Sequence, residues 1–139
     1  MRLSGAAAVV VAGLVTLGCG RSDPETHPVS GRIVLTGGDA SQLAGHHVEA
    51  VLEGDPTVRA SGVIGPDGAF VLESLHGGAV KKGARAGRYQ ARVVAAEENE
   101  DGKKLRKPPV AAKHLKFETS GLSFSVPSTD EVKLVVSPR

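Results

Sequence analysis

The sequence predicts an all-β protein, a seven-stranded antiparallel β-sandwich of the transthyretin-like or immunoglobulin-like type. Two observations lead to this prediction. Apolar and polar residues alternate with a period of two in seven separate segments, as they do in half-buried strands. Sequences rich in Gly, Pro, Ser and Asp separate these segments at short intervals, which is typical of an antiparallel sandwich.

The first two expected strands are residues 29–36 and 47–53. Each places its apolar side chains on one face, opposite polar residues such as Arg32 and Glu49. The residues expected to face inward are Val29, Gly31, Ile33, Leu35, Val48, Ala50 and Leu52. The glycine-containing sequence "TGGDASQLAG" joins the two strands.

The third and fourth expected strands are residues 58–64 and 69–75. Between them stands "GPDG", in which Pro66 fixes φ and Gly68 accepts a positive φ, so we expect a tight hairpin there. The residues expected to face inward are Val58, Ala60, Gly62, Ile64, Phe70 and Leu72.

The last three expected strands are residues 88–95, 121–126 and 131–137. The glycine-rich basic segment before residue 88 is expected to be a long loop, and "PSTDE" is expected to close a final hairpin. The residues expected to face inward are Tyr89, Ala91, Val93, Ala95, Leu122, Phe124, Val126, Val132, Leu134 and Val136. With three Phe, one Tyr and no Trp in 139 residues, the core should be small and mostly aliphatic.

Residues 97–119 lack clean alternation, although Ala111–Leu115 could form a short helix. The segment begins with "EENEDGKKLRK", in which four acids precede four bases across Gly102, so a hairpin with facing charges is expected. Exposed ion pairs contribute only about 0–1 kcal/mol each, and a charge run is usually a solvated surface. The alternative is a contact for an acidic partner or anionic polymer, made by Lys103, Lys104, Arg106 and Lys107. Further basic residues precede or lie in the fifth strand: Lys81, Lys82, Arg85, Arg88 and Arg92.

The N-terminus has the organisation of a signal peptide. Arg2 precedes an uncharged apolar run at residues 6–17, and this run is too short to span a bilayer as a helix, which needs about 20 residues. The polar, proline-containing sequence that follows does not complete a span. We therefore expect export.

The only cysteine of the chain, Cys19, stands at the end of this run. The sequence "TLGC" resembles a bacterial lipobox, except that Thr16 stands where Leu is usual. The resemblance implies a signal peptide at residues 1–18, lipid attachment at Cys19, a flexible tether at 19–28 and a β-sandwich domain at 29–139. Gly20 after the cysteine favours the outer membrane. The alternative is an ordinary signal peptide with an incidental cysteine.

No pattern for catalysis or metal binding emerges from the rest of the sequence. Five histidines are present: His27, His46, His47, His76 and His114. None has metal-ligand spacing, and the adjacent His46 and His47 should point to opposite faces of a strand, so solvated histidines are expected. There is no G-x-S-x-G nucleophile motif. The near-neutral charge balance gives no indication of nucleic acid. We therefore expect a protein that is not an enzyme and that uses no metal or cofactor.

The order of several short motifs is similar to that of a known family. These motifs are "VSGRIV", "GPDGAF", "AGRYQARVV" and "VAAKHLKFETSGLSFSV". Together they resemble the small carboxypeptidase-regulatory-like lipoproteins of planctomycete-type bacteria, over residues 28–137. The resemblance implies a seven-stranded transthyretin-like sandwich in an exported module, and it implies no activity.

Three functional hypotheses follow. The first is a lipid-anchored envelope module with a non-enzymatic structural or binding role toward protein or polysaccharide. The second is a transthyretin-like small-molecule carrier or enzyme, which would need a convergent polar cluster in a pocket. The third is an accessory domain of a larger surface assembly, which would need a stable partner.

Overall fold

The computed structural model describes residues 24–139, and this part of the chain is all-β, as predicted. Its strands are β1 (Thr26–His27), β2 (Ser30–Leu35), β3 (His47–Leu52), β4 (Asp55–Val63), β5 (Ala69–Val71), β6 (Glu73–His76), β7 (Ala79–Lys82), β8 (Ala84–Arg85), β9 (Gly87–Val94), β10 (Leu122–Val126) and β11 (Val132–Val136). Two short 3₁₀ helices, η1 (Ala40–Leu43) and η2 (Ala112–Leu115), lie in the connections. Among these residues no helix has the length and apolar character needed to cross a bilayer.

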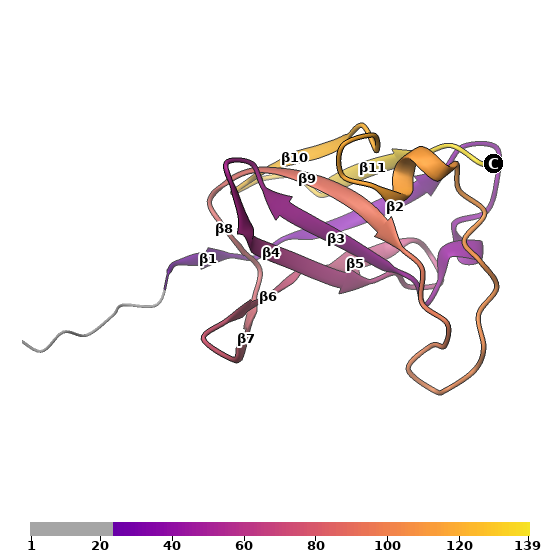
Figure 1. The fold of residues 1–139 in the computed structure, drawn as a ribbon, viewed down its shortest axis with the longest axis horizontal. Coiled ribbons are helices and arrows are strands. Elements are labelled where there is room, and N and C mark those ends of the chain that lie inside the picture. The colour runs from indigo at the N-terminus through magenta and orange to yellow at the C-terminus, as the bar shows by residue number, and fades with distance from the viewer. Residues whose placement is uncertain (1–23) are drawn as a thin grey trace, which may run out of the picture.

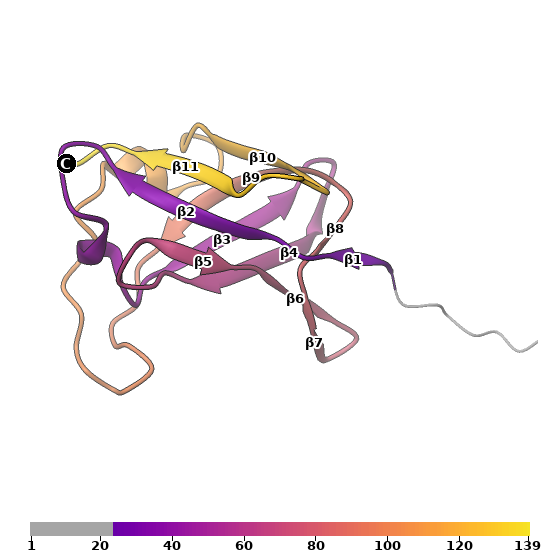
Figure 2. The same ribbon diagram turned by 180° about the vertical axis from the view of Figure 1, so that it is seen from behind.

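Two open sheets face each other and enclose one core (Figures 1 and 2). The larger sheet has the strand order β10-β9-β3-β4-β6-β7, and the smaller has the order β11-β2-β5. A separate two-stranded ladder joins β1 to β8 at one end of the molecule. All seven predicted strand segments are present in this arrangement, and strands β1, β7 and β8 are additional to them.

The core is built mostly from the faces that the alternation predicts, although Ala95, predicted to face inward, is exposed, and Val51, predicted on the opposite face of its strand, is buried. Nearly all of the core side chains are aliphatic, and the main exceptions are Phe70 and Tyr89. The ring of Tyr89 stacks on Phe124 with 5.4 Å between ring centroids, and its hydroxyl donates to the Arg85 carbonyl. The other fully or almost fully buried residues include Ile33, Leu43, Val48, Ala50, Ile64, Leu72, Val93, Leu134 and Val136.

The predicted strand at residues 69–75 is in fact two strands that belong to different sheets. β5 pairs with β2 in the smaller sheet, and β6 pairs with β4 in the larger one. The chain crosses between the sheets at Leu72, which is fully buried. The "GPDG" turn forms as expected, because the Gly68 N–H donates to the Gly65 carbonyl and the Ala69 N–H donates to the Asp67 side chain.

The prediction of a wholly antiparallel sandwich is wrong for the smaller sheet, in which β11 runs parallel to β2 with Leu134 opposite Ile33. The expected final hairpin is also wrong. β10 pairs with β9 in one sheet and β11 pairs with β2 in the other, so "PSTDE" carries the chain from sheet to sheet.

The segment predicted as a long basic loop contains the β6–β7 hairpin and β8. Its turn is Gly77–Gly78, and both residues have positive φ, 55° and 80°, which glycine adopts without steric cost. β8 pairs with β1, so the chain joins the folded domain at Thr26–His27, before the expected boundary at residue 29.

Candidate functional site at the charged hairpin

The segment 97–107, called the charged hairpin below, forms the hairpin that its sequence predicts. The Leu105 N–H donates to the Glu97 carbonyl at 2.8 Å, and the Asn99 N–H donates to the Lys103 carbonyl at 2.9 Å. Asn99 also organises the turn, because its side-chain oxygen accepts from the N–H groups of Asp101 and Lys103. Backbone pairing and one asparagine therefore hold the tip together.

The charges of the charged hairpin do not hold it together. In the part of the chain that the structure describes, no ion pair links its acids to its bases, although Glu98 and Lys104 are opposite each other in the backbone register. All four bases are exposed: Lys103, Lys104, Arg106 and Lys107. These cations are therefore available to a partner.

His46 holds the two ends of the charged hairpin against the body of the protein. The side chain is 1% exposed, and its Nδ1 accepts a hydrogen bond from the Ala96 N–H at 3.0 Å. The ring also bonds the Arg106 carbonyl, so one imidazole contacts the chain before and after the hairpin. Burial lowers the pKa of His46, against a smaller opposing effect of the bond to Arg106. The ring is therefore neutral and structural, and the expectation of a solvated histidine is wrong here.

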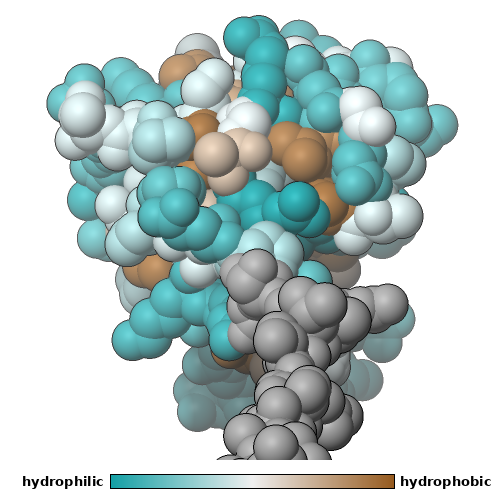
Figure 3. All heavy atoms as spheres, turned by 90° about the vertical axis from the view of Figure 1, so that its left-hand side faces the viewer, coloured by the Kyte–Doolittle hydropathy of each residue, from teal (hydrophilic) through white to brown (hydrophobic). Residues whose placement is uncertain are grey.

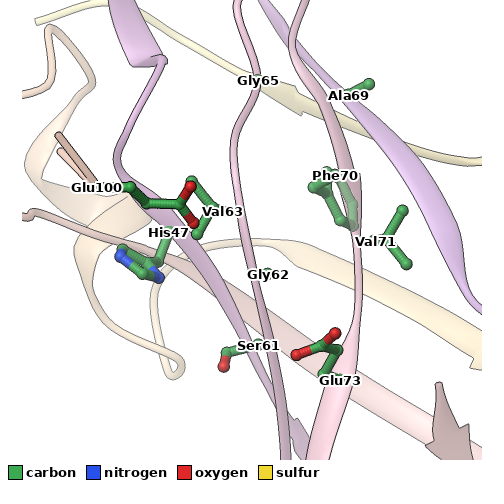
Figure 4. A pocket seen from close by; sticks show the side chains of 10 residues that line it. All are labelled: His47, Ser61, Gly62, Val63, Gly65, Ala69, Phe70, Val71, Glu73 and Glu100. Atoms are coloured by element: carbon green, nitrogen blue, oxygen red, sulfur yellow. The ribbon is translucent and has the colours of Figure 1, made fainter. Parts of the chain in front are cut away.

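An open hollow of about 550 Å³ adjoins the charged hairpin (Figure 4). Glu100, from the acidic arm, and His47, from β3, lie on one side of it, while Glu73 and Ser61 lie together on the other. The rest of its lining is mostly small or apolar. A second hollow of about 420 Å³ lies under the tip, against Asn99, Asp101 and Lys103. Carboxylates therefore gather around the first hollow, while Lys104 and Arg106 line neither.

The hollow does not assemble the groups that catalysis or metal binding requires. Across residues 24–139, no three His, Cys, Asp or Glu side chains come close enough to hold a metal ion. Ser61 has no hydrogen bond to a histidine among the described contacts, so it lacks the activating base of a nucleophile. What the arrangement offers is an exposed, charged surface.

The second basic set lies apart from the charged hairpin. Lys81, Lys82 and Arg85 lie in β7 and β8, before β9 begins, whereas the charged hairpin follows the far end of β9 (Figure 1). Arg88 and Arg92 are on the outer face of the larger sheet, where they pair with Glu53 and Glu49. The two sets do not form one basic surface.

A side-chain cluster on the outer face of the larger sheet was not anticipated from the sequence. Glu49 pairs with both Arg59 and Arg92, and both guanidinium groups lie over the ring of Phe117. The centroid distance is 4.5 Å for Arg92 and 5.6 Å for Arg59. The cluster fastens the loop before β10 to the sheet. Only the strand register, which places Arg92 opposite Glu49, reveals it.

His114 is also buried, at 4% exposure, which again contradicts the expectation of a solvated side chain. Its Nε2 accepts from the Ser137 N–H at 3.0 Å, so the proton of the neutral ring is on Nδ1, which donates to the Ser120 carbonyl at 3.0 Å. Burial lowers the pKa of His114, and the bond to Ser120 partly opposes this. The ring joins η2 to the C-terminal segment and has a structural role.

The predicted lipid-attachment residue Cys19 and the predicted signal peptide lie outside the described residues. Comparison of the chain with models of protein families, with curated proteins and with solved structures finds no match.

Proposed function

We propose that the chain is a lipid-anchored module of a bacterial cell envelope with a non-enzymatic binding or structural role. In this proposal Cys19 carries the lipid, residues 1–18 are the signal peptide, and the domain is a transthyretin-like sandwich similar to the carboxypeptidase-regulatory-like lipoproteins. The sequence order of the signal region, "TLGC" and the polar segment after it supports the anchor.

The placement of the charged hairpin is the observation that carries the binding role. The chain enters the domain through β1, which pairs with β8 at one end of the larger sheet (Figure 1). The charged hairpin is fastened by His46 at the other end of that sheet. A domain anchored by its N-terminus would thus present Lys103, Lys104, Arg106 and Lys107 away from the membrane.

The partner that fits these four cations is an acidic protein surface or an anionic polysaccharide of the envelope. Because the cations are solvated, their attraction for such a partner is screened by salt, with a Debye length of about 8 Å at physiological ionic strength. The binding should therefore be strongest at low salt.

Replacing all four cations by serine is expected to abolish binding to isolated envelope fractions at low ionic strength. The measurement is co-sedimentation of the purified protein with envelope fractions over a series of salt concentrations. The matched control replaces Arg88, Lys113, Lys116 and Lys133 by serine, which removes the same charge from exposed positions outside the charged hairpin. Unchanged binding of the hairpin variant, or equal loss in the control, would reject the assignment.

The alternative is a transthyretin-like small-molecule carrier or enzyme. Its only support is the hollow between Glu100 and Glu73, whose carboxylates would favour a cationic ligand.

A further inference from the structure

The β6–β7 hairpin projects from the body of the protein (Figures 1 and 2). β6 pairs with β4 only through Glu73 and Ser74, although β4 continues to Asp55, so the rest of the hairpin diverges from the neighbouring strand. Leu75 and Val80 are directly opposite each other in the register, on the same face of this projection. The hairpin therefore presents two aliphatic side chains side by side.

These two side chains are unusually exposed for their type. Leu75 is 72% exposed and Val80 is 65% exposed, the two highest values among the large hydrophobic side chains of the described part of the chain. An exposed pair of this kind on a projecting element is typical of a contact site rather than of a core position.

The position of the hairpin relative to the N-terminus indicates what it contacts. β1 lies against β7, and Pro24, the first described residue, lines a cavity of about 180 Å³ together with Leu75 and His76. The 23 residues that precede Pro24 include Cys19. Whatever surface holds Cys19 is therefore separated from the hairpin only by the length of a few residues.

The charged residues around Leu75 and Val80 include both cations, which attract anionic lipid headgroups, and an anion, which does not. Lys81 and Lys82 follow Val80 directly in the sequence, but Glu73 is opposite Lys82 in the register. Figure 3 views the molecule from this end and shows hydrophobic residues as separate areas in a mostly hydrophilic surface. The contact is therefore too small to hold the protein alone, and it can act only beside a covalent anchor.

We propose that the β6–β7 hairpin is a second membrane contact, which inserts Leu75 and Val80 into the headgroup region of the bilayer that Cys19 anchors. This inference rests on the proposed lipid anchor. The hairpin contact fixes the orientation of the domain, because two separate points of attachment restrict rotation about the tether. The charged hairpin then faces away from the membrane.

The absence of tryptophan from the chain gives a direct test. The chain from Cys19 onward, which contains the whole described fold, is prepared with Leu75→Trp and coupled through its only cysteine to a maleimide lipid. The vesicles contain phosphatidylcholine and phosphatidylglycerol. The matched control is Val135→Trp, because Val135 is 51% exposed on β11, in the other sheet. We expect the fluorescence at position 75 alone to shift to shorter wavelength and to be quenched by brominated lipid.

The outcomes separate this inference from the anchor on which it rests. Chemical coupling supplies an anchor whether or not cells acylate Cys19, so an unshifted emission at position 75 overturns the hairpin contact only. Equal shifts at positions 75 and 135 also overturn it. A shift that grows with protein concentration without vesicles would show that a second copy of the chain covers the hairpin instead, and would overturn it too.

A second variant tests the same contact without adding a tryptophan. Leu75→Ser combined with Val80→Ser removes five apolar carbon atoms, and it should make the lipid-coupled protein transfer between vesicles at least about tenfold faster, the effect of burying roughly two of these carbons. Val135→Ser should leave the transfer rate unchanged. An unchanged rate in the double variant overturns the contact.

Discussion

Replacing Gly31 by alanine should lower the free energy of unfolding by about 3 kcal/mol, the upper part of the range for overpacking a core. Gly31 lies in β2, and a Cβ atom there would lie 2.2 Å from Cζ of the Phe70 ring. Phe70 is 2% exposed and is enclosed between the sheets, so its ring has little room to move. Chemical denaturation of the variant measures the loss.

The cause of this loss can be isolated with a double-mutant cycle. In a Phe70→Leu background the ring atoms that would clash are gone, so Gly31→Ala should cost less by at least about 1 kcal/mol. Ser30→Ala, at the exposed neighbouring position, should change stability by no more than about 0.5 kcal/mol. The same cost for Gly31→Ala in both backgrounds would contradict the packing of Phe70 against β2.

We expect the protein to lose stability as the pH falls below about 6.5, the ordinary pKa of histidine. His46 and His114 are neutral in the folded state because each accepts a backbone N–H and is buried. Burial lowers the pKa of both in the folded state, while the unfolded chain binds protons near the ordinary value. The unfolded state thus binds more protons below pH 6.5, and stability falls as the pH falls.

The size of this effect has an upper limit set by proton uptake. Each histidine can contribute a slope of at most about 1.4 kcal/mol per pH unit between its folded and unfolded pKa values. The free energy of unfolding, measured by urea denaturation from pH 8 to pH 5, gives the slope. His46→Asn and His114→Asn should each reduce it, and His76→Asn, at an exposed position, serves as the control. If neither variant changes the slope, the conclusion that both imidazole rings are neutral in the folded protein is wrong.

The faces of the strands could be predicted because alternation is a local property of the sequence. Every predicted inward residue from Val29 to Leu35 except Gly31 is part of the buried core cluster, and Gly31 leaves room there for the ring of Phe70. Strand pairing is not local. Phe70, Leu72 and Ser74 all point inward in an unbroken pattern, so the crossing from one sheet to the other at Leu72 leaves no trace in the alternation.

The β6–β7 hairpin did have a sequence signal, since Gly77–Gly78 between short β-prone segments is typical of a two-residue hairpin turn. Its basic and glycine-rich composition obscured that signal. The burial of His46 and His114 had no comparable signal. Their burial depends on backbone groups 50 and 23 residues away in the sequence.

The charged hairpin of the candidate site could be predicted from the sequence, but the hollow beside it could not. The charged hairpin follows from a local pattern of charge around Gly102, and it forms. The hollow beside it combines Glu100 with His47 and Glu73 from separate strands, and only the fold brings these three residues to one place. The opposite positions of the N-terminal entry and the charged hairpin also depend on the order of the strands in the sheet.

The lipid anchor is tested most directly by the intact mass and membrane partitioning of the protein expressed in a bacterial host with its own signal sequence. We predict that the purified protein begins at Cys19, carries acyl mass on that residue and partitions with membranes. We predict that a Cys19→Ser variant gains no acyl mass and does not partition with membranes. Release of the unaltered chain as a soluble protein without acyl mass would contradict the proposal.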